Sequence, residues 1–371
     1  MPSQLDILAL EPFYGGERRV MLETVIRCSR HRWTLLKLPP RRIERRLAAA
    51  ANWFAEQLTR HWKGHVDVLF VSEAINLATL LRLVPDLAEL PSVVYFHDNQ
   101  LPDAPSSRAG PFDLVNLSTA VSATENWFNS AFHLKRFLSL ATKLVEVHPE
   151  ILGRSPIREL SGKSHVIPPP LDLNLIDHVR KTRADLPARD PRAIFVETRG
   201  ADLNLLNAAL GGLASRGETF RLITVGPIET LSERWQRRTI AERDDAGQVA
   251  GMLEAGVFTS AKRNPVADYL AVRALLAGCC PALPDAGVYR ELLPEMFHSS
   301  YLCGPEHAPL AERLSQAMAS VPSWEAPDFS HHLRDFEAIR ASRIIDERFE
   351  RIATKKQAPA TRMRLRKSRS R

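Results

Sequence analysis

Short apolar runs alternate with longer, more polar stretches along the first half of the chain. The apolar runs are Leu5–Leu10, Val66–Val71, Val93–Phe96, Trp127–Phe128 and Val166–Ile167. The stretches with a helix-like pattern begin near Glu17 and then cover about 41–62, 74–89, 112–124 and 131–146. Such an alternation is typical of a parallel sheet with helices on both faces. The chain is therefore predicted to be an α/β protein.

A second set of the same kind follows the triple proline Pro168–Pro170. Its apolar runs are Ala193–Val196, Phe220–Val225, Val257–Thr259 and Cys279–Ala282. Three consecutive prolines form a stiff extended connection, which favours a domain boundary there. We expect a first Rossmann-like domain at 1–170, a second at 171–327, a C-terminal helix at 328–354 and a disordered basic tail at 355–371.

The composition is that of an ordinary globular protein. The chain has 371 residues, of which 44% are apolar and 25% charged, enough for two domains with their own cores. No apolar run reaches the length of a membrane span, and Asp6 and Glu11 make the N-terminus unlike a signal peptide. The four cysteines match no zinc spacing, so we expect reduced thiols, a cytoplasmic location and no metal. Nothing in the pattern indicates an oligomeric state.

Positive charge is concentrated in two segments. The formal net charge is +7, yet residues 355–371 hold eight Lys or Arg and no acid, and residues 17–63 hold twelve against four Glu. Such clusters indicate a polyanionic partner, either RNA or an anionic membrane surface. The alternative is a solvated helix face plus a disordered end. We favour RNA for 17–63, with Arg41 and Arg42 as contacts, because Trp33, Trp53 and Trp62 are interleaved with its arginines.

Polar residues follow several of the predicted strands. Gly15 and Gly16 come after the first strand and before a helix, where backbone N–H groups can meet an anion such as a nucleotide phosphate. The polar run His97–Gln100 follows the strand Val93–Phe96, and Asn129 follows Trp127–Phe128. Because ligands of such sheets bind at the carboxyl ends of the strands, we expect these residues to face one crevice.

Four segments of the first half indicate a particular family: LEPFYGGERR, RHRWTLLKLPPRRIERR, VVYFHDNQL and WFNSAFHLKRFL. In this order they resemble the N-terminal domain of tRNA-queuosine mannosyltransferases, relatives of the family-four glycosyltransferases with the GT-B fold. The resemblance covers about residues 5–140 well and 257–295 more weakly. It implies two Rossmann-like domains facing a cleft and a C-terminal helix that crosses back to the first. It also implies retaining transfer of mannose from GDP-mannose, as donor substrate, to queuosine in a tRNA anticodon, without a cofactor.

The resemblance also assigns roles to residues. His97 and Asp98, where the family has His-Glu, would face the transferred sugar as the catalytic pair. Asn99, Gln100 and Asn129 would bind the acceptor, with Arg41 and Arg42 on the RNA. The donor would be held by Gly15, Gly16, Arg199 and Glu291, the last in a turn that also contains Asp285 and Tyr289.

The donor half departs from the family pattern. The run Gly278–Pro281 fixes the alignment, and counting back places Pro265 and Arg273 where the family has two glutamates. Asp268, where a glycine is usual, could supply a replacement carboxylate. No lysine follows Arg199 until Lys262, so the phosphate clamp lacks a charge.

These departures leave three readings open. The first is an active mannosyltransferase. The second is a non-catalytic relative that binds tRNA, in which restoring Glu at both positions should raise donor affinity. The third is a glycosyltransferase with another nucleotide sugar or acceptor, motivated by the segment Pro102–Ser107, where the family has an aromatic-containing acceptor loop.

Overall fold

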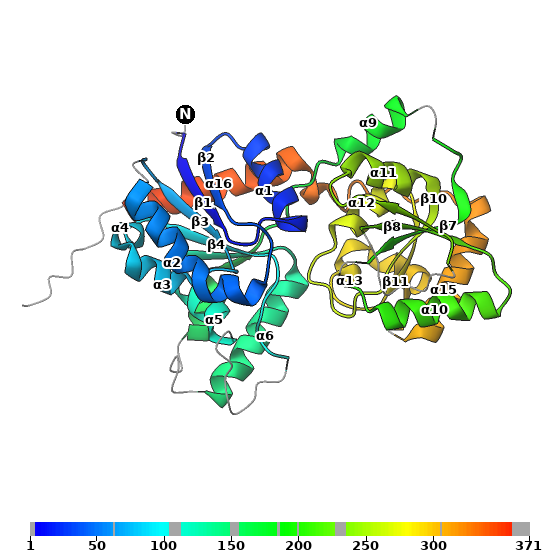
Figure 1. Ribbon diagram of the computed structural model, residues 1–371, viewed down its shortest axis with the longest axis horizontal. Coiled ribbons are helices and arrows are strands. Elements are labelled where there is room, and N and C mark those ends of the chain that lie inside the picture. The colour runs from blue at the N-terminus through cyan, green and yellow to red at the C-terminus, as the bar shows by residue number, and fades with distance from the viewer. Residues whose placement is uncertain are drawn as a thin grey trace, which may run out of the picture.

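Two parallel six-stranded sheets, one after the other along the chain, form the framework of the protein (Figure 1). The computed structural model describes residues 4–61, 64–103, 113–148, 156–183, 186–198, 200–226, 235–304 and 306–357. The tail expected to be disordered therefore lies almost entirely outside the described residues.

The first sheet has the strand order β2-β1-β3-β4-β5-β6. Its strands are β1 (Asp6–Glu11), β2 (Arg32–Lys37), β3 (Val68–Ser72), β4 (Ser92–Phe96), β5 (Glu125–Phe128) and β6 (Ser164–Val166). Its helices are α1 (Gly16–Cys28), α2 (Ile43–His61), α3 (Leu77–Leu83), α4 (Pro85–Ala88), α5 (Asp113–Ser122), α6 (Ala131–Val147) and α8 (Pro156–Gly162).

Helices cover both faces of this sheet, as the continuous apolar runs predict. Successive strand residues point to opposite faces, so Ile7 and Phe70 join one core cluster while Leu8 and Leu69 join the other. The strand β2 was not predicted from the sequence. It lies at the edge of the sheet and has exposed polar residues, so it lacks the continuous apolar run of the other strands.

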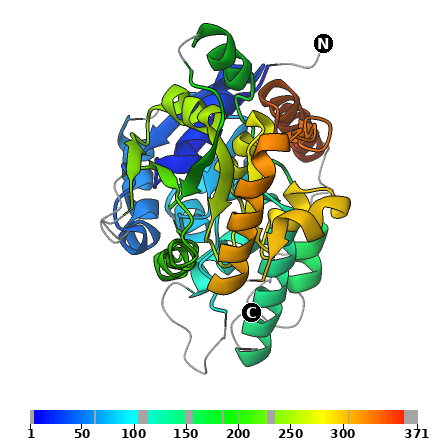
Figure 2. The same ribbon diagram turned by 90° about the vertical axis from the view of Figure 1, so that its right-hand side faces the viewer.

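The second sheet has the order β12-β11-β10-β7-β8-β9. Its strands are β7 (Asp190–Glu197), β8 (Arg221–Val225), β9 (Arg237–Ile240), β10 (Ala255–Ser260), β11 (Cys280–Pro284) and β12 (Leu302–Cys303). The helices are α9 (Asn174–Thr182), α10 (Leu203–Ser215), α11 (Asp245–Glu254), α12 (Tyr269–Ala277), α13 (Tyr289–Leu292), α14 (His298–Tyr301) and α15 (His307–Ser320). Figure 2 views this unit from its outer side, with α15 in orange at the front.

The last described helix, α16 (Ala338–Gln357), crosses back to the first sheet, as the family resemblance implies. The Phe349 ring lies 5.5 Å from the Trp33 ring and 5.0 Å from the Trp127 ring. Asp346 accepts hydrogen bonds from the Ser29 hydroxyl (2.6 Å) and the Arg30 backbone N–H (2.9 Å). The two units are therefore joined both at the crossover after β6 and through α16.

Two helix predictions need correction. The helix expected at 328–354 begins only at Ala338, because the preceding residues form turns and a short 3₁₀ helix at Arg334–Phe336 that bury Phe329 and Leu333. The helix expected at 74–89 is split into α3 and α4 at Pro85, since proline lacks the N–H that would continue α3 and disfavours a helical residue before it.

Candidate functional site

A cavity of about 850 Å³ lies between the two units, at the carboxyl ends of the strands. The first unit lines it with Phe13, Gly15, Arg18, His97, Asp98 and Gln100, and the second with a continuous segment from Lys262 to Ala267 and with Gly200–Asp202. The predicted crevice is therefore present, and it brings together the glycine turn and the His97 loop.

A buried set of charged side chains lies beneath the wall formed by the first unit. Arg18 of α1 makes a two-pronged ion pair with Glu73, which follows β3; the Nη1–Oε2 distance is 3.0 Å. Arg18 also lies 3.9 Å from Glu11, and both carboxylates are almost completely buried. Burial raises the pKa of Glu11 to about 6, against the opposing effect of the Arg18 guanidinium. Sequence analysis missed this set, although Glu73 stands at a strand end as His97 does.

Glu73 holds the His97 loop in place. Its carboxylate accepts the backbone N–H of His97 (3.2 Å) and that of Asp98 (3.1 Å). The Gln100 N–H donates to the Asn116 side chain (2.6 Å), whose amide donates to the Glu73 backbone carbonyl (3.0 Å). The loop is thus fixed through its backbone, which leaves the side chains of His97, Asp98 and Gln100 directed to the cavity they line.

The His97 imidazole is buried, yet neither of its ring nitrogens has a hydrogen-bond partner among the residues that the structure describes. Burial, with a smaller contribution from the Arg18 charge, lowers the pKa of His97 well below its usual value. The ring is therefore neutral near pH 7, with one donor and one acceptor nitrogen available. A buried polar group without a partner costs free energy, and a ligand hydroxyl in the cavity would remove this cost.

Asn129 lies beneath the loop and does not line the cavity. Its amide donates to the His97 backbone carbonyl (2.9 Å), and its oxygen contacts Nδ1 of His133 (2.8 Å). Asn99 is likewise absent from the cavity wall, and its side chain accepts the Leu101 N–H (3.2 Å). The structure thus gives both residues a supporting position, whereas the sequence suggested acceptor contact.

The structure requires glycine at both positions of the turn, for a different reason at each. A Cβ atom at Gly15 would come within 2.5 Å of the Pro40 ring, and Gly16 has a φ of 53°, which favours glycine. Gly15 is the N-cap of α1 and provides no side-chain cap. Gly15 therefore allows the close approach of Pro40, and Gly16 allows the positive φ at the first residue of α1.

The second unit contributes two cations that sequence analysis did not assign to the site. Lys262 and Arg263 follow β10 directly, a strand-end position that is readable in the sequence. Lys262 lies 3.3 Å from Asp268, and Arg263 pairs with Asp202 while remaining largely exposed. Predicted Arg199 lies outside the described residues.

Asp268 and Glu291 are already engaged in protein contacts. Asp268 caps α12 through the Ala271 N–H (3.0 Å) and accepts the Tyr289 hydroxyl (2.8 Å), so it offers no free carboxylate to a sugar. The Glu291 carboxylate accepts the first N–H groups of α6, from Ala131 (2.9 Å) and Phe132. Glu291 therefore joins the two units and does not line the cavity, contrary to the donor-binding role expected for it.

The basic segment 17–63 is partly neutralised within the fold. Six of its cations are paired with acids: Arg18, Arg19, Arg27, Arg30, Arg32 and Arg60. Trp33 packs against Phe70 and Phe349, so it is no RNA-facing ring, and Trp62 lies outside the described residues. Three exposed arginines, Arg41, Arg42 and Arg45, remain beside the cavity-lining Ile43.

Arg42 has a φ of 53° and is the one non-glycine residue with positive φ in the described part of the chain. This conformation is unfavourable for an arginine, and such strain is often found at functional positions.

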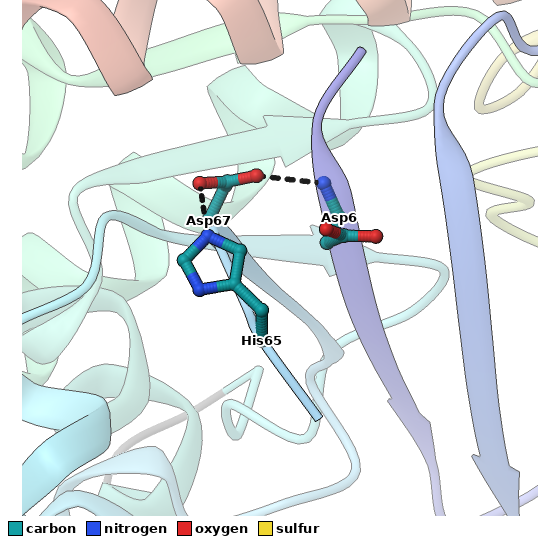
Figure 3. A group of neighbouring side chains, drawn as sticks. All are labelled: Asp6, His65 and Asp67. Atoms are coloured by element: carbon teal, nitrogen blue, oxygen red, sulfur yellow. Dashed lines mark hydrogen bonds and ion pairs between the residues drawn. The ribbon is translucent and has the colours of Figure 1, made fainter. Parts of the chain in front are cut away.

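One group of side chains elsewhere has the spacing of metal ligands: Asp6, His65 and Asp67 (Figure 3). Asp67 accepts the Asp6 backbone N–H (2.8 Å) and pairs with His65 (2.9 Å). Both Asp6 carboxylate oxygens accept hydrogen bonds from Arg32 (2.7 and 2.6 Å). Each of these carboxylate oxygens already has a protein partner. We therefore interpret the group as a set of contacts that joins the start of β1 to the residues before β3, and not as a metal site.

Comparison with known proteins shows which proteins the chain is similar to. Residues 6–171 match the model of the N-terminal part of tRNA-queuosine alpha-mannosyltransferase. Over 313 residues the chain is 25% identical to the tRNA-queuosine alpha-mannosyltransferase of Drosophila melanogaster, covering 78% of this chain and 82% of the relative. Its first unit is thus similar to the N-terminal part of tRNA-queuosine alpha-mannosyltransferases. This similarity supports glycosyl transfer as the activity of the chain.

Solved structures confirm the GT-B fold of the chain. Sucrose-phosphate synthase from Thermosynechococcus elongatus superposes with a TM-score of 0.66 at 11% identity, over 95% of this chain and all of the other. A glycosyltransferase from Rickettsia africae gives a TM-score of 0.62 at 12% identity, over 94% and 99% of the two chains. No described helix is both long and apolar enough to span a membrane.

Proposed function

We propose that this protein transfers mannose from GDP-mannose to queuosine in a tRNA anticodon, with retention of configuration, in the cytoplasm. The observation that carries the proposal is the buried, unpartnered His97 imidazole, which faces the cavity from the unit that matches the family model. A sugar hydroxyl is the kind of group that would satisfy a neutral imidazole at this position.

The first unit would hold the transferred sugar. His97 would bind a sugar hydroxyl, and the Asp98 carboxylate would face the positive charge that develops on the sugar ring as the bond to the diphosphate breaks. Glu73 fixes the backbone of both residues through hydrogen bonds of 3.2 and 3.1 Å. Such preorganisation supports the transition state without reorganisation during the reaction.

The leaving diphosphate needs positive charge and N–H donors. The turn at Gly15 and Gly16 would supply backbone donors, and Lys262 and Arg263, with Arg199, would supply cations. The acceptor would enter past Gln100, with the exposed Arg41, Arg42 and Arg45 on the tRNA backbone phosphates.

The test is incubation of queuosine-containing tRNA with GDP-mannose, followed by mass spectrometry of the released nucleosides. A hexose-sized mass increase on queuosine is expected. His97→Ala should lower the rate about a hundredfold or more, because a hydrogen bond to the reacting sugar is lost. His178→Ala, which changes an exposed histidine on α9, is the matched control and should keep the wild-type rate. A wild-type rate for His97→Ala would contradict the role of His97.

A non-catalytic tRNA-binding function is the second candidate, and the state of the donor wall favours it. Pro265 lines the cavity at the position where the resemblance implies a glutamate, and the nearby Asp268 is engaged by Tyr289 and Lys262. This candidate predicts tRNA binding without turnover and without calorimetric binding of GDP or GDP-mannose. Turnover with another nucleotide sugar in the same assay would indicate a different donor.

A further inference from the structure

A separate cavity of about 470 Å³ lies at the other edge of the first sheet, where β5 and β6 begin and α16 passes them. Its lining includes Glu125, Lys163, His165, Arg348 and Arg351. The cavity that contains the His97 loop lies at the carboxyl ends of the strands. A strand of four residues such as β5 spans about 13 Å, so the two cavities lie at different ends of the sheet.

Positive charge exceeds negative charge around this second cavity. Among the described residues that line it, the acid is Glu125, whose side chain is nearly buried. Its Oε2 accepts hydrogen bonds from Nε of Arg348 (2.9 Å) and from the Trp127 indole (2.9 Å). Nη2 of Arg348 lies at the same distance from this oxygen. The carboxylate therefore neutralises Arg348, which leaves the charges of Lys163 and Arg351.

The Lys163 ammonium is held in a fixed position by neutral groups. It donates hydrogen bonds to the backbone carbonyls of Val121 and Ala123, at the end of α5 (both 2.6 Å). An ammonium has three donors, so one is left for a ligand in the cavity that Lys163 lines. Burial lowers the pKa of Lys163, against a smaller opposing effect of Glu159. A bound anion would offset the cost of keeping this charge away from water.

Arg351 connects the cavity to the end of α16. It is exposed and has no acidic partner among the described residues. The helix ends at Gln357, six residues or about 9 Å of helix axis beyond Arg351. Residues 355–371 contain eight Lys or Arg and no acid, and nearly all of them lie outside the described part of the chain. The cavity thus lies beside the origin of a strongly basic segment.

We propose that this cavity and the end of α16 form a second docking surface for tRNA, in which Lys163 and Arg351 hold a phosphate of the RNA backbone. A polyanion can contact the cavity and the basic segment after α16 at the same time, whereas a small phosphate can occupy only one of them. Lys163 lies inside a recess, which a phosphodiester strand reaches more readily than the flat surface of a membrane does. The identification of the RNA as tRNA rests on the proposed function.

The place of this surface determines what it contributes. It lies at the opposite edge of the sheet from His97, so it contacts a part of the tRNA other than the nucleotide that enters the His97 cavity. Two linked contacts raise the overall affinity, because the first makes the second intramolecular. The second docking surface should therefore affect tRNA binding and not the chemical step.

The test is the binding of full-length tRNA to the full chain, without a donor, measured by fluorescence anisotropy over a range of salt concentrations. Replacing Lys163 and Arg351 together with Gln should raise the Kd about threefold or more and reduce the slope of log K against log salt by about one to two. Lys163 also contacts the end of α5, so its replacement could affect folding. Arg351→Glu changes an exposed residue and should weaken binding on its own. Arg82→Glu, on α3, is the matched control and should bind as the wild type does.

Three results would overturn the inference. The first is an unchanged Kd and salt slope in both variants, with native circular-dichroism spectra. The second is thermal stabilisation of the wild type by inorganic phosphate that is lost in Arg351→Glu while tRNA binding is unchanged, which would indicate a site for a small anion. The third is sedimentation with vesicles that contain phosphatidylserine, lost in Arg351→Glu while tRNA binding is unchanged, which would indicate a membrane contact.

The inference and the proposed function can fail independently. Binding of tRNA that depends on Arg351, in a protein that does not transfer mannose, keeps the second docking surface and removes the activity. If the protein does transfer mannose, Arg351→Glu should raise the KM for tRNA and leave kcat unchanged. Transfer with a wild-type KM in Arg351→Glu would keep the activity and remove the second docking surface.

Discussion

His133 shows how the surroundings of a single side chain set its charge. It is fully buried on α6, and its Nδ1 lies 2.8 Å from the Asn129 oxygen. Burial, with help from the Arg136 and Arg18 charges, lowers the pKa of His133 to about 3. Because Asn129 also holds the His97 carbonyl, a neutral His133 helps to keep the His97 loop in position.

We expect acid to weaken the fold through this residue. The unfolded chain binds a proton at His133 with a pKa near 6.5, whereas the folded chain does so only near 3, so protons favour unfolding below pH 6.5. From pH 7 to pH 5 the free energy of unfolding should fall by about 2 kcal/mol on account of His133.

Urea unfolding of wild type and His133→Asn at both pH values would measure the difference. The variant should be less stable at pH 7 and should lose less on acidification. Equal losses in the two proteins would show that His133 does not control this transition.

At the scale of single residues, the sequence predicted which strand ends line the cavity but not which side chains hold them in place. His97, Asp98 and Gln100 line the cavity as expected, since a polar run after a buried strand is a local signal. The pairing of Arg18 with Glu73 spans 55 positions, and no local pattern reports which buried charges meet. Asn129 was misjudged for the same reason: an amide at a strand end can face the ligand or support its neighbour.

Among the elements, α6 has the most informative contacts, because its N-terminus is capped from both units. Ser130 accepts the His133 N–H (3.0 Å) and donates to the Val266 carbonyl of the second unit (2.6 Å). Glu291 receives the N–H groups of Ala131 and Phe132 across the same boundary. A carboxylate at a helix N-terminus is stabilising through both hydrogen bonding and the dipole. The contacts of α6 thus join the two units that line the cavity.

Replacing the Glu291 carboxylate should loosen the contact between the two units. We expect Glu291→Gln to lower the free energy of unfolding by about 1 kcal/mol or less and to raise the radius of gyration measured by small-angle X-ray scattering. Glu295→Gln changes an exposed residue close by and should alter neither quantity. Identical scattering from Glu291→Gln and wild type would contradict a role for Glu291 in holding the two units together.

The elements themselves were predictable where periodicity is strong. The helix α6 was expected at 131–146 and is observed at Ala131–Val147, because its apolar face repeats regularly. The strand β2 was missed because its residues are exposed or half-buried. The start of α16 was misplaced because Phe329 and Leu333 have helical spacing but are buried by turns.

The charge of the whole molecule is less uneven than the sequence suggests. Half of the cations in residues 17–63 are paired with acids, three of them far away in the chain: Asp172 with Arg27, Glu350 with Arg30, and Glu73 with Arg18. The net charge of a segment can be counted from the sequence. The sequence does not show which distant acids will pair with its cations in the fold. Among the arginines of the described residues 17–61, the exposed ones without an acidic partner are therefore Arg41, Arg42 and Arg45.

We expect these three arginines to carry much of the salt-dependent binding of tRNA. Replacing all three with Ala should weaken binding and reduce the slope of log K against log salt by about two to three, since each phosphate contact contributes roughly 0.7 to 0.9. The measurement is filter binding over a range of salt concentrations.

The control replaces Arg180, Arg216 and Arg343, exposed arginines with acidic partners elsewhere on the molecule, and should leave the slope unchanged. An unchanged slope in the Arg41, Arg42 and Arg45 variant would mean that this surface is only solvated.

The return of α16 to the first sheet has a consequence for biosynthesis. The rings of Trp33, Phe70 and Trp127 are covered by Phe349, which leaves the ribosome only after the entire second sheet has been made. The first unit therefore cannot complete its core while it is being translated, and its aromatic face stays uncovered during that interval. A nascent chain in this state is a natural client for chaperones, and both units should reach their native state together, once α16 has left the ribosome.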